Sequence, residues 1–124
     1  MRVLVVDDEF LIRWSIAETL GAAGHEVTEA QDAASALASL EETPDPDVVL
    51  LDFRLPDSND LGLLAKIRRL APASEVVMMT AFGTPEVTAG ALELGACKVL
   101  SKPFNMHDLE DIVRTHGQLR SVLH

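Results

Sequence analysis

The amino-acid sequence predicts a doubly wound α/β domain of three layers, with a five-stranded parallel sheet in the order 2-1-3-4-5. Short runs of β-branched and aliphatic residues alternate with segments whose apolar residues recur at helical spacing. The run over 48–51 is continuously apolar, as in a strand buried on both faces of a parallel sheet. Such alternation implies right-handed crossovers, with helices on both faces.

Composition bounds the class of protein. The chain has 124 residues, of which 48% are apolar and 24% charged, as in an ordinary globular protein. No linker divides it, so we expect a single domain over 1–124. We expect its last residues to lead to an output domain. A net charge of −10 argues against binding to nucleic acid or to an anionic membrane surface. Met1 leads directly into a strand, without a signal peptide, and no apolar run is long enough to span a bilayer.

The cysteine content favours a cytoplasmic location. Cys97 is the only cysteine in the sequence, so no disulfide can form within one chain. Because it lies in an apolar stretch, we interpret it as a small buried hydrophobic residue.

The first half of the chain predicts strands over 2–6, 26–30 and 48–52, with helices over 10–23 and 33–40 between them. Gly24 is expected to end the first helix in a left-handed conformation, and Asp32 to cap the start of the second. The core-facing stripe expected on the first helix consists of Ile12, Ile16, Thr19, Leu20 and Ala23.

The second half predicts helices over 61–71 and 84–94, strands over 75–80 and 97–101, and a last helix capped by Asn105. Pro72 ends the third helix, while Thr84 and Pro85 are typical of a helix start. The apolar face of the third helix is expected to hold Leu61, Leu64, Ile67 and Leu70. That of the last helix is expected to hold Met106, Leu109, Ile112 and Val113.

Polar residues follow four of the predicted strands. Asp7 and Asp8 end the first, Asp52 the third and Thr80 the fourth, while Lys102 follows the fifth. In this strand order these ends are adjacent at one edge of the sheet. Taken alone, each residue has a simpler explanation, such as acids at a helix start, a β-branched strand residue, or a turn. Because all five residues are expected at the same edge of the sheet, we interpret them as a functional site.

The chemistry of this set points to phosphoryl transfer. Clustered carboxylates repel one another and call for a cation, and their hard oxygens suit Mg²⁺. An ionised carboxylate such as Asp52 can attack phosphorus and form an aspartyl phosphate. Lys102 would offset charge on the transferring group, and Thr80 would donate a hydrogen bond to it.

Together these residues resemble the receiver domain of bacterial two-component response regulators, the CheY-like family, which has a flavodoxin-like strand order. The segments 12–14 and 78–86 are most similar to receivers of NtrC-type regulators, which drive σ54-dependent transcription. The resemblance rests on Val5-Val6-Asp7-Asp8-Glu9, Leu50-Leu51-Asp52-Phe53-Arg54-Leu55-Pro56, Met79-Thr80-Ala81-Phe82-Gly83, Leu94-Gly95-Ala96 and Ser101-Lys102-Pro103-Phe104.

The resemblance implies a phosphoprotein that signals and controls transcription, rather than an enzyme acting on other substrates, although it catalyses its own phosphorylation and dephosphorylation. A sensor histidine kinase would phosphorylate Asp52, and Thr80 and Lys102 would contact the phosphoryl group. The implied Mg²⁺ ligands are Asp8, Asp52, the backbone carbonyl of Arg54 and, through water, Asp7.

The resemblance also implies an output face formed by the fourth helix, fifth strand and fifth helix, able to pair two receivers. We expect Phe10 and Trp14, outside the core stripe of the first helix, to dock the kinase. The sequence departs from the family at two positions. Val99 stands where the family has an aromatic switch residue, and Asp60 where it usually has glycine.

Three alternatives stay open at this point. A haloacid dehalogenase-type phosphatase also uses an aspartate nucleophile, but it needs a second acid two residues later, where this chain has Arg54. A nucleotide- or flavin-binding module would need a glycine-rich loop after the first strand, where this chain has acids. The third alternative is a receiver-like interaction module that is never phosphorylated.

Overall fold

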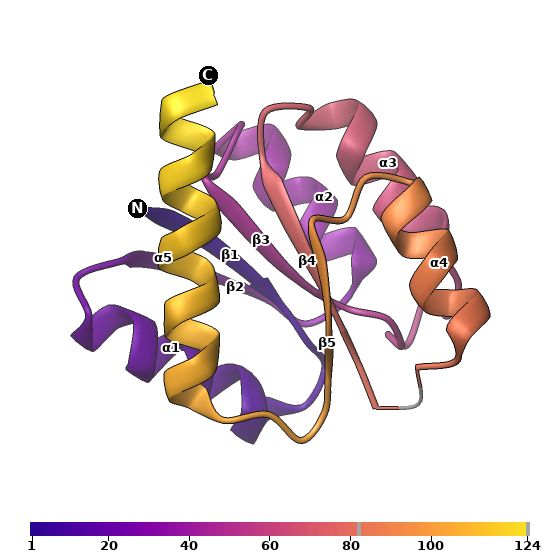
Figure 1. Cartoon of the computed structure of the whole chain (residues 1–124), viewed down its shortest axis with the longest axis horizontal. Coiled ribbons are helices and arrows are strands. Elements are labelled where there is room, and N and C mark those ends of the chain that lie inside the picture. The colour runs from indigo at the N-terminus through magenta and orange to yellow at the C-terminus, as the bar shows by residue number, and fades with distance from the viewer. Residues whose placement is uncertain (82, 124) are drawn as a thin grey trace.

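The computed structural model describes the backbone of residues 1–81 and 83–123 and the side chains of residues 1–81 and 83–118. Strands and helices alternate through the described chain (Figure 1). The strands are β1 (Arg2–Val6), β2 (Glu26–Ala30), β3 (Val48–Asp52), β4 (Glu75–Thr80) and β5 (Lys98–Ser101). The helices are α1 (Phe10–Ala22), α2 (Ala33–Glu42), α3 (Gly62–Leu70), α4 (Pro85–Glu93) and α5 (Met106–Leu123).

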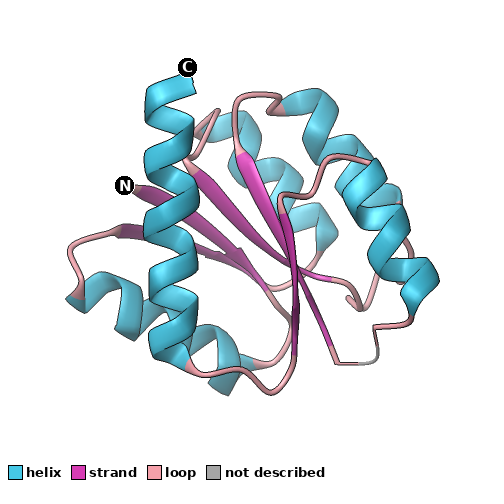
Figure 2. Ribbon diagram, in the orientation of Figure 1, coloured by secondary structure: helices cyan, strands magenta, loops and turns pink. Residues whose placement is uncertain are grey.

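The strands form one sheet in the order β2-β1-β3-β4-β5, and every pairing is parallel (Figure 2). This order confirms the predicted fold class. Successive strands are joined through helices, as parallel pairing requires, because a two-residue hairpin cannot reverse the chain into a parallel neighbour.

Helices cover both faces of the sheet, α1 and α5 on one and α2, α3 and α4 on the other (Figure 1). Because successive side chains of a strand point to opposite faces, Val3 and Val5 pack with α1 and α5, while Leu4 and Val6 pack with the other three helices. All five residues of β3 are buried, which confirms the prediction for that strand. The described helices include none long and apolar enough to cross a membrane.

The predicted helix boundaries agree with the local hydrogen bonds. The Asp32 side chain accepts a 2.7 Å hydrogen bond from the Ser35 amide, and the Thr84 hydroxyl accepts one of 3.2 Å from the Val87 amide. Gly24 has a φ of 94°, the left-handed conformation expected where α1 ends. Asn105 caps α5 as predicted, with its side chain accepting from the His107 amide at 2.7 Å.

Two apolar stripes were predicted incorrectly at their ends. Leu70 is the last residue of α3 and is 60% exposed, while Leu63 and Ala71 are buried instead. Ala23, at the end of α1, is also exposed. In both cases helical spacing continues to the last turn, but the chain leaves the sheet there, so the final stripe residue meets solvent. The strand predicted over 97–101 begins one residue later, at Lys98.

Candidate functional site

Four neighbouring strands deliver the predicted site residues to one edge of the sheet. Asp52 is the last residue of β3 and Thr80 the last of β4, while Asp7 and Asp8 directly follow β1. Lys102 follows β5, and its amide donates a 2.8 Å hydrogen bond to the Thr80 carbonyl, which holds the lysine beside β4. The structure therefore brings together all five side-chain positions that the sequence assigned to the site.

The three acids form a compact cluster. Carboxylate oxygens of Asp7, Asp8 and Asp52 all lie within 4.8 Å of one another. Asp7 is fully buried and Asp52 is 6% exposed, whereas Asp8 faces solvent. Such a set of hard oxygen donors, open to solvent on one side, fits a Mg²⁺ ion that keeps several waters.

Lys102 neutralises part of this charge. Its Nζ donates a hydrogen bond of 2.8 Å to Asp7 Oδ2 and lies 3.4 Å from Asp52 Oδ2, with its side chain 9% exposed. Burial alone lowers the pKa of Lys102, but the hydrogen bond to Asp7 and the charges of both acids outweigh burial, so the pKa lies above its ordinary value. Lys102 therefore carries a positive charge in this cluster at neutral pH.

The environment of Asp52 disfavours its ionised form. Burial, followed by the negative charge of Asp7, raises its pKa to about 6, although Lys102 and the Arg54 amide act in the opposite direction. A carboxylate that is costly to keep charged is poised to react or to bind a cation. A pocket of about 260 Å³ gives access to it, lined by Asp8, Glu9, Asp52, Phe53, Arg54, Thr80, Ala81 and Lys102.

Comparison with known proteins identifies this arrangement. The response regulator receiver domain model matches residues 3–114. The chain belongs to the response regulator receiver family. It is 29% identical over 120 residues to the sporulation initiation phosphotransferase F of Bacillus subtilis, covering 97% of this chain and 96% of that protein. It is 35% identical over 111 residues to the DNA-binding transcriptional regulator NtrC of Escherichia coli, covering 90% of this chain and 24% of that one.

A solved structure agrees with this assignment. The CheY-like receiver domain protein of Methanospirillum hungatei JF-1 superimposes with a TM-score of 0.93 at 30% identity, over 99% of this chain and 98% of that one. The receiver thus spans nearly all of some relatives and about a quarter of NtrC. Within the segment 79–83 that carried the resemblance, Phe82 lies outside the described residues.

Two supporting residues of the receiver escaped the sequence analysis. The Asp57 carboxylate, five positions after Asp52 in the loop that follows β3, accepts hydrogen bonds of 2.8 and 3.1 Å from the Ala33 and Ala34 amides at the start of α2. Arg13 Nη1 on α1 donates a 2.8 Å bond to the Asp7 carbonyl. Both contacts tie site loops to helices. An acid after a proline in a loop was the only available signal for Asp57.

The two departures from the family pattern fit the fold without disturbing the acids. The Asp60 side chain accepts a 2.8 Å hydrogen bond from the Gly62 amide at the start of α3. Among the described non-glycine residues only Asp45 has a positive φ, so the loop holds Asp60 without a left-handed backbone. Val99 is half-buried and packs against the core shared by α2, α3 and α4.

Proposed function

We propose that this receiver accepts a phosphoryl group on Asp52 from a sensor histidine kinase, in a Mg²⁺-dependent reaction. The observation that supports this most directly is the position of the buried Asp52 carboxylate, 3.4 Å from Lys102 Nζ and beside two further acids. In the reaction an Asp52 oxygen forms a bond to phosphorus while the phosphorus–nitrogen bond of phosphohistidine breaks and imidazole leaves. Hydrolysis of the aspartyl phosphate by water returns the carboxylate and inorganic phosphate.

The residues fit a bound Mg²⁺. Asp8, Asp52 and the backbone carbonyl of Arg54 would hold it directly. Both oxygens of Asp7 already accept hydrogen bonds, from the Glu9 amide and Lys102, which suits Asp7 to hold the ion through water. When bound, the ion would supply positive charge to the transferring phosphoryl group.

The chain's own side chains perform the remaining tasks in this proposal. Lys102 would pair with a phosphoryl oxygen, since its ammonium already lies beside Asp52. The Thr80 hydroxyl would donate to another oxygen, from the adjacent strand end. A Cβ at Gly83 would lie 2.9 Å from Thr80 Cγ2, so glycine at that position leaves the threonine room to turn.

Exposure to a small phosphodonor tests this proposal. Wild-type protein incubated with acetyl phosphate and Mg²⁺ should gain the mass of one phosphoryl group, because the site itself carries the catalytic groups. The same incubation with EDTA should leave the intact mass unchanged. A full mass gain in EDTA would show that the acids are not a magnesium site, and no gain under either condition would contradict phosphorylation itself.

We also propose that α1 docks the kinase through Phe10 and Trp14. These aromatic side chains are 62% and 49% exposed and lie one helical turn apart, close in the chain to the sheet edge that carries the acids. Arg13 lies over the Phe10 ring, 5.8 Å from its centroid, which orders the patch. Exposed aromatic residues are the usual anchors of protein interfaces.

Replacing Phe10 and Trp14 together by alanine should slow transfer from a phosphorylated kinase that serves the wild type, and spare labelling by acetyl phosphate. The matched control is the pair Leu70→Ala and Leu92→Ala, since those leucines are also exposed but belong to α3 and α4. Equal slowing with both donors would point to a damaged site, and equal kinase rates in both pairs would exclude this docking surface.

We further propose that α4, β5 and α5 form the output face, through which two receivers pair and a transcriptional output is controlled. A close approach of α4 to the loop after Asp52 supports a route from the site to α4. A Cβ at Gly90 would lie 2.8 Å from Leu61 Cδ1, and Leu61 precedes α3 in the loop that follows Asp52. Glycine thus lets α4 rest on a side chain of the phosphoacceptor loop. Because residue 99 is valine, this route does not use an aromatic rotamer switch.

Beryllofluoride, which mimics the aspartyl phosphate, should change hydrogen-exchange protection over residues 84–100 in the wild type. Gly90→Ala should reduce this change, because it displaces Leu61 and favours the helix by about 1 kcal/mol. Ala89→Gly is the control. Ala89 is the exposed neighbour of Gly90, and glycine at position 89 disfavours the helix by about 1 kcal/mol without displacing Leu61. Protection changes confined to the loops around Asp52 would contradict the route.

A further inference from the structure

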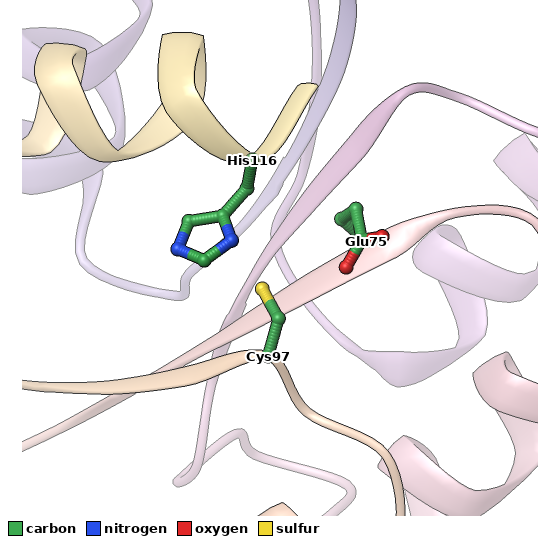
Figure 3. Close-up of side chains that lie close together, drawn as sticks. All are labelled: Glu75, Cys97 and His116. Carbon is green, nitrogen blue, oxygen red and sulfur yellow. The ribbon is translucent and has the colours of Figure 1, made fainter. Parts of the chain in front are cut away.

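A second cluster of metal-ligating side chains lies away from the acids. Glu75 begins β4, Cys97 immediately precedes β5 and His116 belongs to α5. One ligand atom from each, an oxygen, a sulfur and a nitrogen, lies within 4.8 Å of the other two. Figure 3 shows the three side chains converging from separate elements. Since Glu75 pairs with Val48 and Asp52 pairs with Met79, this cluster sits at the opposite edge of the sheet from Asp52.

The backbone holds these three positions firmly. The Cys97 amide donates a 2.8 Å hydrogen bond to the Val76 carbonyl, and the Glu75 amide donates one of 3.1 Å to the Asp47 carbonyl. On α5, a Cβ at Gly117 would overlap the Met1 side chain, so glycine there allows the helix to approach the sheet closely next to His116. The ligands therefore come from the sheet edge and from a helix packed directly on it.

We propose that Glu75, Cys97 and His116 bind one Zn²⁺ ion. Thiolate, imidazole and carboxylate are the donors that zinc takes in proteins, and three of them leave a fourth tetrahedral position for water. Tetrahedral bonds of the usual length place donor atoms roughly 3.5 Å apart, a spacing compatible with ligand atoms that all lie within 4.8 Å of one another. The sulfur and nitrogen donors disfavour Mg²⁺, which the all-oxygen cluster at the other edge suits.

The groups around the Cys97 thiol determine whether it carries a proton when the ion binds. Burial, followed by the charge of Glu75 and a hydrogen bond to it, raises the pKa of the Cys97 thiol to about 12. The ion therefore replaces the thiol proton, which leaves to solvent as the metal–sulfur bond forms. The positive charge of Arg68 lowers the pKa of this thiol slightly and would also repel an incoming cation, although its guanidinium donates a 2.5 Å hydrogen bond to the Ser74 carbonyl. All three ligands are half-buried, which leaves a path from solvent.

Bound zinc would fasten α5 to the β4–β5 edge. Ligands on three elements become cross-linked, and any ion that binds only the folded chain stabilises it. None of the three ligands belongs to the acidic cluster around Asp52.

Titration with Co²⁺, a spectroscopic substitute for zinc, tests the site in the whole chain. One equivalent should produce a near-ultraviolet thiolate-to-cobalt charge-transfer band, and Zn²⁺ should abolish that band while excess Mg²⁺ leaves it. Zn²⁺ should also raise the melting temperature of the wild type. Cys97→Ser should lose both effects, and circular dichroism of the metal-free variant checks its fold.

Matched variants separate this cluster from other ligands. His116→Gln should lose the band, whereas His107→Gln, on the exposed face of the same helix, should keep it. Glu75→Gln should weaken Co²⁺ binding, and Asp52→Asn should bind Co²⁺ at this site as the wild type does. The proposal is overturned if wild-type protein shows no charge-transfer band, or if the band survives in a folded His116→Gln variant.

Discussion

Replacing Asp52 by asparagine should abolish the gain of a phosphoryl group from acetyl phosphate and, in the absence of Mg²⁺, make the protein more stable at pH 7. The first effect follows because asparagine has no ionised oxygen to attack phosphorus. The second follows because the folded chain holds Asp52 at 6% exposure, beside the buried Asp7. Asparagine keeps the shape of the side chain and removes the buried charge.

The size of the stability effect depends on pH. The pKa of Asp52 is about 6 in the folded chain, against an ordinary value of 3.8 that applies to the unfolded chain, so the folded state binds this proton more tightly. Below pH 3.8 both states are protonated and ionisation of Asp52 costs nothing. As pH rises through about 6 the folded state loses stability, by roughly 1–3 kcal/mol at pH 7. The advantage of Asp52→Asn should therefore be largest at pH 7 and fade toward pH 4.

Urea denaturation in EDTA at several pH values measures this difference, with Asp57→Asn as the matched control. The pKa of Asp57 is lowered by hydrogen bonds from the start of α2, so its ionised form stabilises the fold. Asp57→Asn should consequently lose stability at pH 7, and this loss should shrink as the pH falls. If Asp52→Asn also lost stability at pH 7, as is expected of Asp57→Asn, the fold would not disfavour the negative charge on Asp52. If the Asp52→Asn variant still gained a phosphoryl group, Asp52 would not be the phosphoacceptor.

Replacing Lys102 by methionine should reduce the free energy of unfolding by about 3 kcal/mol at pH 7 in EDTA, because one partner of a buried ion pair is lost. Lys102 Nζ lies 2.8 Å from Asp7 and 3.4 Å from Asp52, two carboxylates that are almost fully buried. The pKa of Lys102 is raised above 10.5, so its stabilising contribution is complete at pH 7 and is lost only at strongly alkaline pH. Methionine fills similar space without the charge.

Lys98→Met provides the control, since Lys98 is exposed on β5 and its removal should change stability by less than about 0.5 kcal/mol. Adding Mg²⁺ should restore part of the stability lost in Lys102→Met, because another cation then offsets the same acids. Combining Lys102→Met with Asp52→Asn should cost less than Lys102→Met alone, since fewer buried charges are left unpaired. If Lys102→Met and Lys98→Met lose equal stability in EDTA, the buried acids do not depend on this lysine.

The sequence by itself determined the strand order and which polar side chains gather at one edge of the sheet. Asp52 and Thr80 each end an apolar run and Asp7 directly follows one, and alternation of strands and helices implies parallel pairing. In such a sheet the position of a residue at a strand end is enough to place it at one edge, whatever the details of packing. The start of a helix is equally local, as the hydrogen bonds to Asp32 and Thr84 show.

Only the tertiary structure decided which side chains meet across different elements. Asp57 reaches the Ala33 amide, 24 positions away, and no pattern in the chain relates Glu75, Cys97 and His116. Sequence reasoning interpreted Cys97 as a buried hydrophobic residue; it does pack against the core, but it is only half-buried and its thiol lies beside Glu75. Strand order follows from the succession of elements, but contacts of a few ångströms follow from loop paths and helix positions, which the packing of the whole core sets.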